Sequence, residues 1–162
     1  MKGSVFLALA ATVLSTPLFA QDYNKEPTYG EVSLKAGFEP DPYSIEIVAG
    51  GDIDAASTLG GDCAGWVADA PDFRLHYNAG EFPLLIAALG SDSGMDVTLV
   101  ISAPDGQWAC DDDSFDDGDA GFVFSDPQSG QYDIWIGNFE NQGGGEATLY
   151  ISESLAQELL GN

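Results

Sequence analysis

The sequence has very little positive charge. Four Lys and Arg residues stand against 27 Asp and Glu residues, and the formal net charge is −23 at pH 7. A field of this sign repels phosphate backbones and anionic lipid headgroups, so nucleic acids and membrane surfaces are disfavoured as partners. The same field attracts cations. Solubility in a salty environment and specific ion binding would each account for the acidity, and both interpretations stay open.

Histidine and the common catalytic motifs are scarce as well. The chain has one His, His76, and contains neither Gly-x-Ser-x-Gly nor His-Glu-x-x-His. The segment Ser91–Met95 resembles the nucleophile turn of trypsin-like proteases, but His76 precedes it too closely for the chymotrypsin order. A carboxylate pair for glycoside hydrolysis has no specific signal here. We therefore expect no enzymatic activity, and a secreted hydrolase is the least favoured class.

Long apolar runs are absent after the first twenty residues. Lys2 gives a positive start, Val5–Leu14 is apolar, and Ala20 ends a segment that fits signal-peptidase cleavage. The run is too short for a permanent membrane span. The sequence therefore predicts a signal peptide over residues 1–20 and no membrane insertion after its removal. The expected location is the periplasm or the outside of a Gram-negative bacterial cell.

Cysteine is limited to Cys63 and Cys110. An even number in an exported chain favours a single disulfide bond, worth about 4 kcal/mol in the chain-entropy model. Two free thiols, one of them a metal ligand, are the alternative. Neither cysteine belongs to a cluster with metal-site spacing.

The apolar residues that are present alternate with polar ones. Val32, Leu34 and Ala36 share one face of a predicted strand, and further stripes run through residues 43–47, 73–77, 97–101, 122–124, 132–136 and 147–151, with an almost wholly apolar run over 83–89. This periodicity predicts an all-β, antiparallel sandwich or barrel of about eight or nine strands. Only Ser154–Leu160 is expected to be helical, with Ser152 or Ser154 as its cap and Gly161 as its end. We expect one domain over 29–162 after a flexible lead-in over 21–28.

Four segments in a fixed order carry a resemblance. They are Asp96–Ile101, Pro104–Gly106, Trp108–Asp113 and Ser129–Ile136. In this order they resemble the bacterial pre-peptidase C-terminal (PPC) domain family. Pro71–Leu75 and Cys110–Asp113 bring the chain closer to a group of small stand-alone exported proteobacterial proteins.

The resemblance implies a jelly-roll-like β-sandwich that is an accessory module and not a catalytic one. Such domains are associated with secretion, with stability of a protease, or with binding to matrix and carbohydrate, and some bind calcium. Because no protease is attached here, an independent binding role is favoured. The expected partners are a calcium ion and a secreted protease, an envelope protein or a polysaccharide. Carbohydrate binding and a purely structural envelope role are the alternatives.

An acidic loop is the candidate metal site. Calcium takes six to eight oxygen ligands, which a flexible loop supplies from carboxylates and carbonyls. The proposed ligands are Asp111, Asp112, Asp113 and Asp116, joined by Asp96 and Asp105 if the fold brings them close. The spacing is not that of an EF-hand. A solvated acidic loop without a metal is the competing interpretation.

Aromatic residues offer a second candidate site. Trp135, Tyr132 and Trp108 could form a platform for sugar rings. Packing at the edge of the core is the alternative, and we favour it because Trp residues of β-sandwiches mostly pack there and because Trp108 lies close to Cys110.

Overall fold

The computed structural model describes residues 21–61, 63–91, 95–115, 118–140 and 143–161. The predicted signal peptide over 1–20 lies outside these residues. The elements are β1 (Glu31–Lys35), β2 (Tyr43–Ala49), β3 (Ile53–Asp54), α1 (Ala55–Thr58), β4 (Trp66–Val67), β5 (Phe73–Asn78), β6 (Leu84–Gly90), β7 (Val97–Ser102), β8 (Trp108–Asp111), β9 (Ala120–Phe124), β10 (Gly130–Asn138), β11 (Gly145–Ser152) and α2 (Ser154–Leu160).

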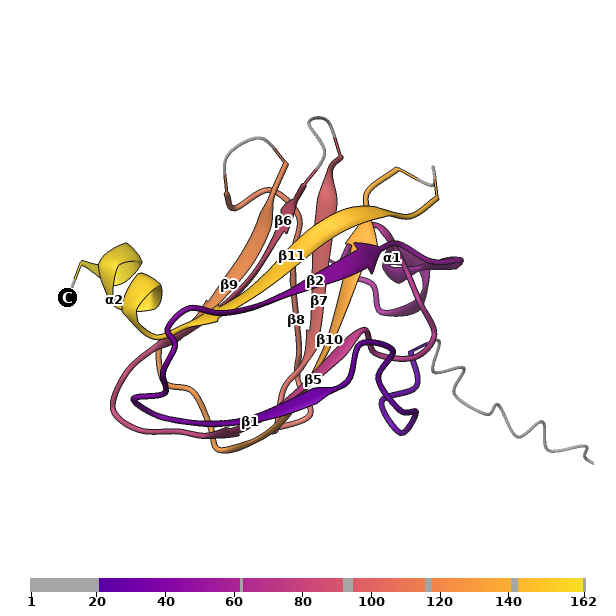
Figure 1. Ribbon diagram of the computed structural model, residues 1–162. Helices are drawn as coiled ribbons and strands as arrows, with labels where there is room; N and C mark the ends of the chain where they lie inside the picture. Colours follow the sequence, from indigo (N-terminus) through magenta and orange to yellow (C-terminus); the bar gives the residue numbers. More distant parts are fainter. Residues whose placement is uncertain (1–20, 62, 92–94, 116–117, 141–142, 162) are drawn as a thin grey trace, which may run out of the picture.

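The strands form two stacked sheets (Figure 1). In the first sheet β10 lies at the centre. One edge of β10 pairs with β5 and then with β4, and these two strands continue to β1 and β3. The other edge of β10 pairs with β7, which in turn pairs with β8. The second sheet has the order β2-β11-β6-β9. The all-β sandwich with a short C-terminal helix is therefore confirmed. The described residues form eleven strands and not the eight or nine predicted, because short strands such as β3 and β4 leave no alternating pattern. One pairing differs from the antiparallel prediction, because β1 runs parallel to β5.

The main core fills the space between the sheets. Alternate residues of each strand point inward, and Phe73, Leu75, Ile134 and Ile136 of the first sheet are almost fully buried. From the second sheet, the buried inward residues are Ile47, Ala49, Leu84, Ile86, Ala88, Ala120, Ala147, Leu149 and Ile151. Burial of this alternating apolar set is what drives the sandwich to form.

A second apolar cluster lies on the outer face of the first sheet. The segment with β3, α1 and β4 folds over this face and packs Ala55 and Val67 against Val100 and Trp135. The predicted disulfide bond is confirmed, because Cys63 is joined to Cys110 at the edge of this cluster. The bond therefore fastens the covering segment to β8.

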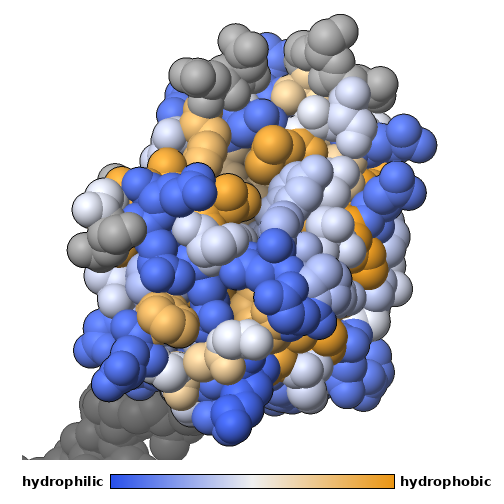
Figure 2. All heavy atoms as spheres, turned by 60° about the vertical axis from the view of Figure 1, so that its left-hand side comes forward, coloured by the Kyte–Doolittle hydropathy of each residue, from blue (hydrophilic) through white to orange (hydrophobic). Residues whose placement is uncertain are grey.

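Helix α2 lies on the outer face of the second sheet. Ala156 is buried against Leu85 and Ala87 of β6. The predicted end is confirmed, because Gly161 ends the helix at φ 74°. The cap position is held by Glu153 and not by Ser152 or Ser154, although the Ser152 Oγ accepts a hydrogen bond from the Leu155 N–H at 3.0 Å. Apolar side chains remain visible among hydrophilic ones on this side (Figure 2). Neither helix in the described part of the chain has the length and apolarity needed to cross a membrane.

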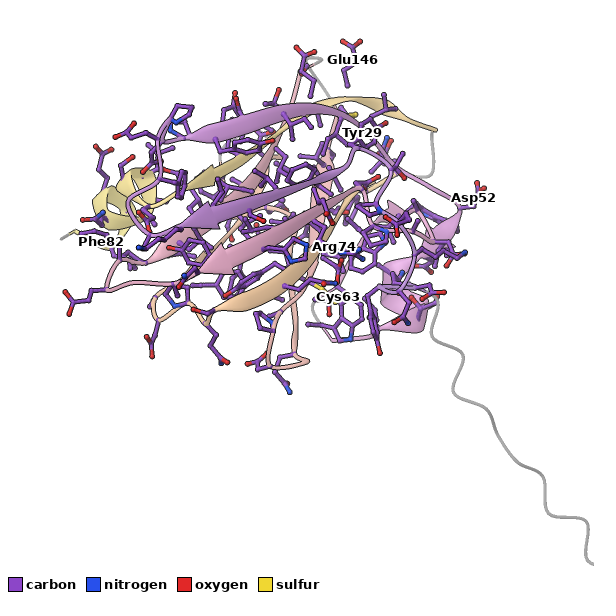
Figure 3. All side chains as sticks on the ribbon, turned by 60° about the horizontal axis from the view of Figure 1, so that its bottom comes forward. Tyr29, Asp52, Cys63, Arg74, Phe82 and Glu146 are labelled. Carbon is purple, nitrogen blue, oxygen red and sulfur yellow. A yellow bond between two sulfur atoms is a disulfide. The ribbon has the colours of Figure 1, made fainter. Side chains whose placement is uncertain are left out.

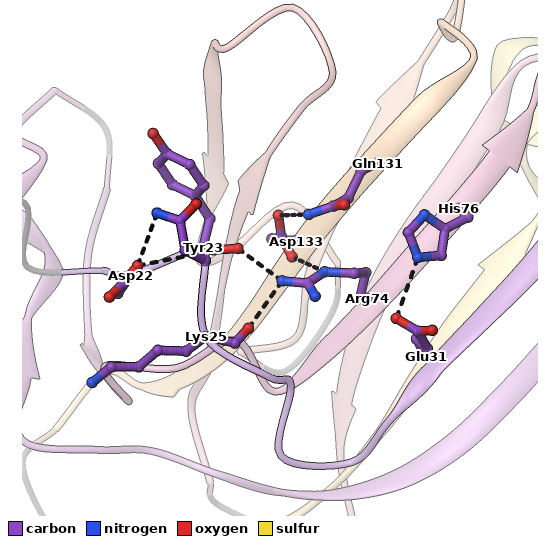
Figure 4. Close-up of polar contacts among 9 residues, drawn as sticks. Asp22, Tyr23, Lys25, Glu31, Arg74, His76, Gln131 and Asp133 are labelled. Atoms are coloured by element: carbon purple, nitrogen blue, oxygen red, sulfur yellow. Dashed lines mark hydrogen bonds and ion pairs between the residues drawn. The ribbon is translucent and has the colours of Figure 1, made fainter.

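The lead-in over 21–28, expected to be flexible, is held against the first sheet. Arg74 of β5 donates hydrogen bonds from Nη2 to the carbonyls of Tyr23 (2.8 Å) and Lys25 (3.0 Å), and from Nε to the Asp133 carboxylate (2.6 Å). Figure 4 shows this arrangement, and Figure 3 shows Arg74 and Cys63 on the same side of the molecule. Arg74 and Asp133 are both buried. A buried guanidinium thus ties the start of the domain to its centre.

Asp72 fills a gap beside β10. Its carboxylate accepts a hydrogen bond from the Ile136 N–H at 2.7 Å. Ile136 lies between Ile134, the last residue of β10 that pairs with β5, and Asn138, which pairs with β4. Asp72 is 3% exposed. Burial raises the pKa of this carboxyl to about 7, although the hydrogen bond from Ile136 acts in the opposite direction.

The Asp72 carboxyl gives the protein a predictable dependence on pH. A carboxyl whose pKa rises on folding contributes stability that is fully present at a pH below its ordinary pKa of 3.8. This contribution is lost as the pH rises through the folded-state pKa of about 7. Asp72→Asn has no proton to lose. We therefore expect its free energy of unfolding to rise relative to wild type as pH increases across this window, measured by urea unfolding. Asp52→Asn, at an exposed site, is the control. Parallel pH profiles for wild type and Asp72→Asn would contradict the assignment.

Candidate cation-binding site

The register of β7 decides which acidic residues meet. Leu99 of β7 is paired with Asp111 of β8, so the chain beyond Asp111 runs toward Asp96 at the start of β7. On the other side of β7, Val97 is paired with Asn138 at the end of β10. Asp96 therefore lies between the segment that leaves β8 and the segment that leaves β10.

Two backbone hydrogen bonds fix Asp96 at this junction. Its carbonyl accepts from the Phe139 N–H at 2.9 Å, and the next residue, Val97, donates to the carbonyl of Gly118 at 3.0 Å. Gly118 has φ +82°, and a Cβ there would lie 3.4 Å from the Asp96 carboxyl. A side chain at position 118 would thus lie in contact with Asp96, and the positive φ would strain its backbone.

The Asp96 carboxyl is poorly neutralised. Its Oδ1 atom is buried and has no hydrogen-bond partner among the residues that the structure describes. Desolvation raises the pKa of this carboxyl, and the negative charges of Asp113, Asp112 and Glu140 raise it further. The connections β6–β7, β8–β9 and β10–β11 therefore bring like charges to one end of the sandwich. We call Asp96, Asp112, Asp113 and Glu140 the acidic junction.

Other acidic residues of the loop hold the backbone in place. The Asp111 carboxylate accepts hydrogen bonds from the Ser114 N–H (3.1 Å), the Ser114 hydroxyl and the Gly121 N–H (2.8 Å). The Asp119 carboxylate accepts from the Gly90 N–H at 2.8 Å. Asp111, predicted as a ligand, is therefore engaged in closing the loop between β8 and β9.

Of the remaining predicted ligands, Asp105 is separated from the acidic junction. Asp105 lies in the turn after β7, and because the six residues of β7 span about 20 Å, it is at the opposite end of the sandwich from Asp96. The condition set for Asp105, that the fold brings it close to the other carboxylates, is thus not met. Asp116 lies outside the described residues. Glu140 was missed, because nothing in the sequence pairs the end of β10 with the acidic loop.

The junction is not a closed cage. Among the residues that the structure describes, no three His, Cys, Asp or Glu side chains are grouped closely enough to hold a metal ion. The donors at the junction are nevertheless all hard oxygen atoms, the kind that calcium prefers. One of them, Asp96 Oδ1, is buried with no hydrogen-bond partner in the described part of the chain. In chemical type these residues fit calcium.

The predicted aromatic platform does not form. Trp135 is fully buried in the second apolar cluster, and Tyr132 is 1% exposed in the main core. Trp108 packs on Trp135 with ring centroids 5.6 Å apart and stays partly exposed. The preference for core packing is therefore right for Trp135 and Tyr132, because alternation places one on each buried face of β10.

Comparisons with solved structures give several distant likenesses, of which two are described here. No model of a known protein family matches the chain, and no curated protein matches it. The pre-peptidase C-terminal domain of a collagenase from Bacillus anthracis is similar over 79% of this chain and 100% of that one, with 13% identity and a TM-score of 0.45. A periplasmic inhibitor of g-type lysozyme from Aeromonas hydrophila is similar over 75% of this chain and 96% of that one, with 14% identity and a TM-score of 0.39. Neither likeness carries an argument about function.

Proposed function

We propose that this protein is an exported, non-catalytic binding module whose β-sandwich is stabilised by a calcium ion at the acidic junction. The observation that carries the proposal is the Asp96 carboxyl. One of its oxygens is buried with no partner among the described residues, and the negative charges of Asp112, Asp113 and Glu140 act on it. The confirmed disulfide bond supports the exported part of the proposal, because such bonds persist in oxidising compartments.

A cation would resolve the electrostatic conflict at the junction. Without one, like charges keep the carboxylates apart, which accords with the lack of a preformed cage among the described residues. Calcium tolerates irregular, flexible coordination by carboxylates and carbonyls, whereas magnesium requires a nearly ideal octahedron. In this proposal Asp96, Asp112 and Asp113 approach the ion, and Asp111 keeps its role in closing the loop.

The thermal midpoint of the purified protein tests the calcium proposal. A ligand that binds only the folded state at a concentration 100 times its Kd adds about 2.7 kcal/mol, which for a domain of this size raises the midpoint by about 8–10 °C. We expect this rise in calcium relative to EGTA. A midpoint that is the same in both solutions would contradict the proposal.

Matched variants locate the effect. Asp96→Asn is expected to abolish the response to calcium and to raise the midpoint in EGTA, because it removes a charge that the junction disfavours. Asp105→Asn changes an exposed carboxylate at the other end of β7 and is expected to keep the full response. Equal responses from the two variants would mean that calcium binds elsewhere.

A further inference from the structure

A cleft of about 500 Å³ lies at the end of the sandwich opposite the acidic junction. Its walls come from three distant parts of the chain: the lead-in, the turn between β7 and β8, and the start of β10. Tyr23 and Trp108 are its aromatic residues, and Ser102, Ser129, Gln131 and Asp133 are among its polar ones. A volume of this size lies within the usual range for small-molecule sites.

The polar wall is ordered by strand register. Trp108 is paired with Ser102, and Ser102 with Asp133, so the three side chains form a row across β8, β7 and β10 on the outer face of the first sheet. The Asp133 carboxylate is 4% exposed and is held from both sides, by Arg74 Nε at 2.6 Å and Gln131 Nε2 at 2.8 Å (Figure 4). Each carboxylate oxygen can still accept another hydrogen bond. The cleft thus presents fixed acceptors.

The aromatic residues supply apolar surface beside these acceptors. Tyr23 is 43% exposed, and its carbonyl accepts the 2.8 Å hydrogen bond from Arg74 that docks the lead-in. Trp108 is partly exposed and rests on Trp135. Aromatic rings held in this way offer a flat apolar surface with a polar rim.

From these features we infer that the cleft binds a neutral oligosaccharide. A sugar ring has an apolar face of C–H groups that stacks on an aromatic ring, and hydroxyl groups that donate hydrogen bonds to carboxylate, amide and hydroxyl oxygens. The net charge of −23 disfavours uronic, sulfated and phosphorylated sugars. This site gives the proposed binding module a ligand class. It is independent of the calcium proposal, because Asp96 lies at the other end of β7.

Calorimetric titration of the purified protein with neutral oligosaccharides tests the inference. The panel comprises cello-, malto-, xylo-, manno- and N-acetylchito-oligosaccharides, together with oligogalacturonate as an anionic member. We expect at least one neutral member to bind with a Kd of about 1 mM or tighter, with and without EGTA, and to change the fluorescence of Trp108. Binding of no neutral member, or of the anionic member alone, would overturn the inference. Loss of binding in EGTA would overturn its independence from calcium.

Variants at exposed positions connect the binding to this cleft. Tyr23→Ala is expected to weaken the binding at least tenfold, and Tyr23→Phe to retain it, because the stacking ring is kept. Phe139→Ala removes an aromatic side chain of similar exposure (47%) beside the acidic junction and is expected to leave binding unchanged. Gln131→Ala is a second exposed change in the cleft, which is expected to weaken binding while the protein stays folded. Equal effects of Tyr23→Ala and Phe139→Ala would place the sugar elsewhere.

Discussion

Arg74→Leu is expected to lower the free energy of unfolding by about 3–5 kcal/mol, as is usual when one member of a buried ion pair is removed. The variant leaves the buried Asp133 carboxylate without its 2.6 Å partner. It also leaves the carbonyls of Tyr23 and Lys25 without the donor that docks the lead-in. Urea unfolding at neutral pH measures the loss.

Two controls separate the effect of removing a buried charge from the effect of removing any charge. Lys25 and Asp69 form an ion pair whose side chains are 47% and 49% exposed, so Lys25→Ala is expected to lower the free energy of unfolding far less than Arg74→Leu, because solvent screens surface pairs. Arg74→Leu combined with Asp133→Leu removes both buried charges and is expected to cost less than the sum of the single changes. Additive losses would show that the pair is not coupled.

Loss of the disulfide bond is expected to cost about 4 kcal/mol, because Cys63 and Cys110 are 47 positions apart and close a long loop in the unfolded chain. The same change releases the segment with α1 and β4 from β8, and Trp135 lies beneath that segment. We expect a fall in the thermal midpoint on the order of 10 °C on reduction.

The Cys63→Ala/Cys110→Ala protein is the matched control for reduction. It is expected to unfold at the midpoint of the reduced wild type and to be insensitive to reductant. A wild-type midpoint that does not change on reduction would contradict the role given to the bond in holding the outer cluster.

The positions of the main strands could be predicted from local sequence patterns. Those of the covering segments, namely β3, α1, β4 and the lead-in, could not. The stripe Phe73, Leu75 and Tyr77 gave the position of β5, since burial on one face leaves a period of two. The elements β3, β4 and α1 are too short to show a period. The docking of the lead-in depends on Arg74, which is 51 positions from Tyr23 in sequence and lies between the apolar residues of the stripe.

The candidate sites show the same limit. Asp96 and Asp105 are both close to the ends of β7 in sequence, and only the antiparallel register shows that the acidic loop turns toward Asp96. Glu140 joins the junction because β10 runs beside β7, a pairing that no local pattern reveals. The cleft proposed to bind an oligosaccharide is lined by Tyr23 and Trp108, which come together only when the lead-in is docked on the first sheet.

A crystal structure of the protein grown with calcium, with anomalous data, tests the central proposal most directly. The proposal predicts a calcium peak at the acidic junction, with Asp96 and at least one of Asp112 and Asp113 at about 2.3–2.6 Å from the ion. A junction without an anomalous peak in crystals soaked at high calcium, with these carboxylates still apart, would contradict it.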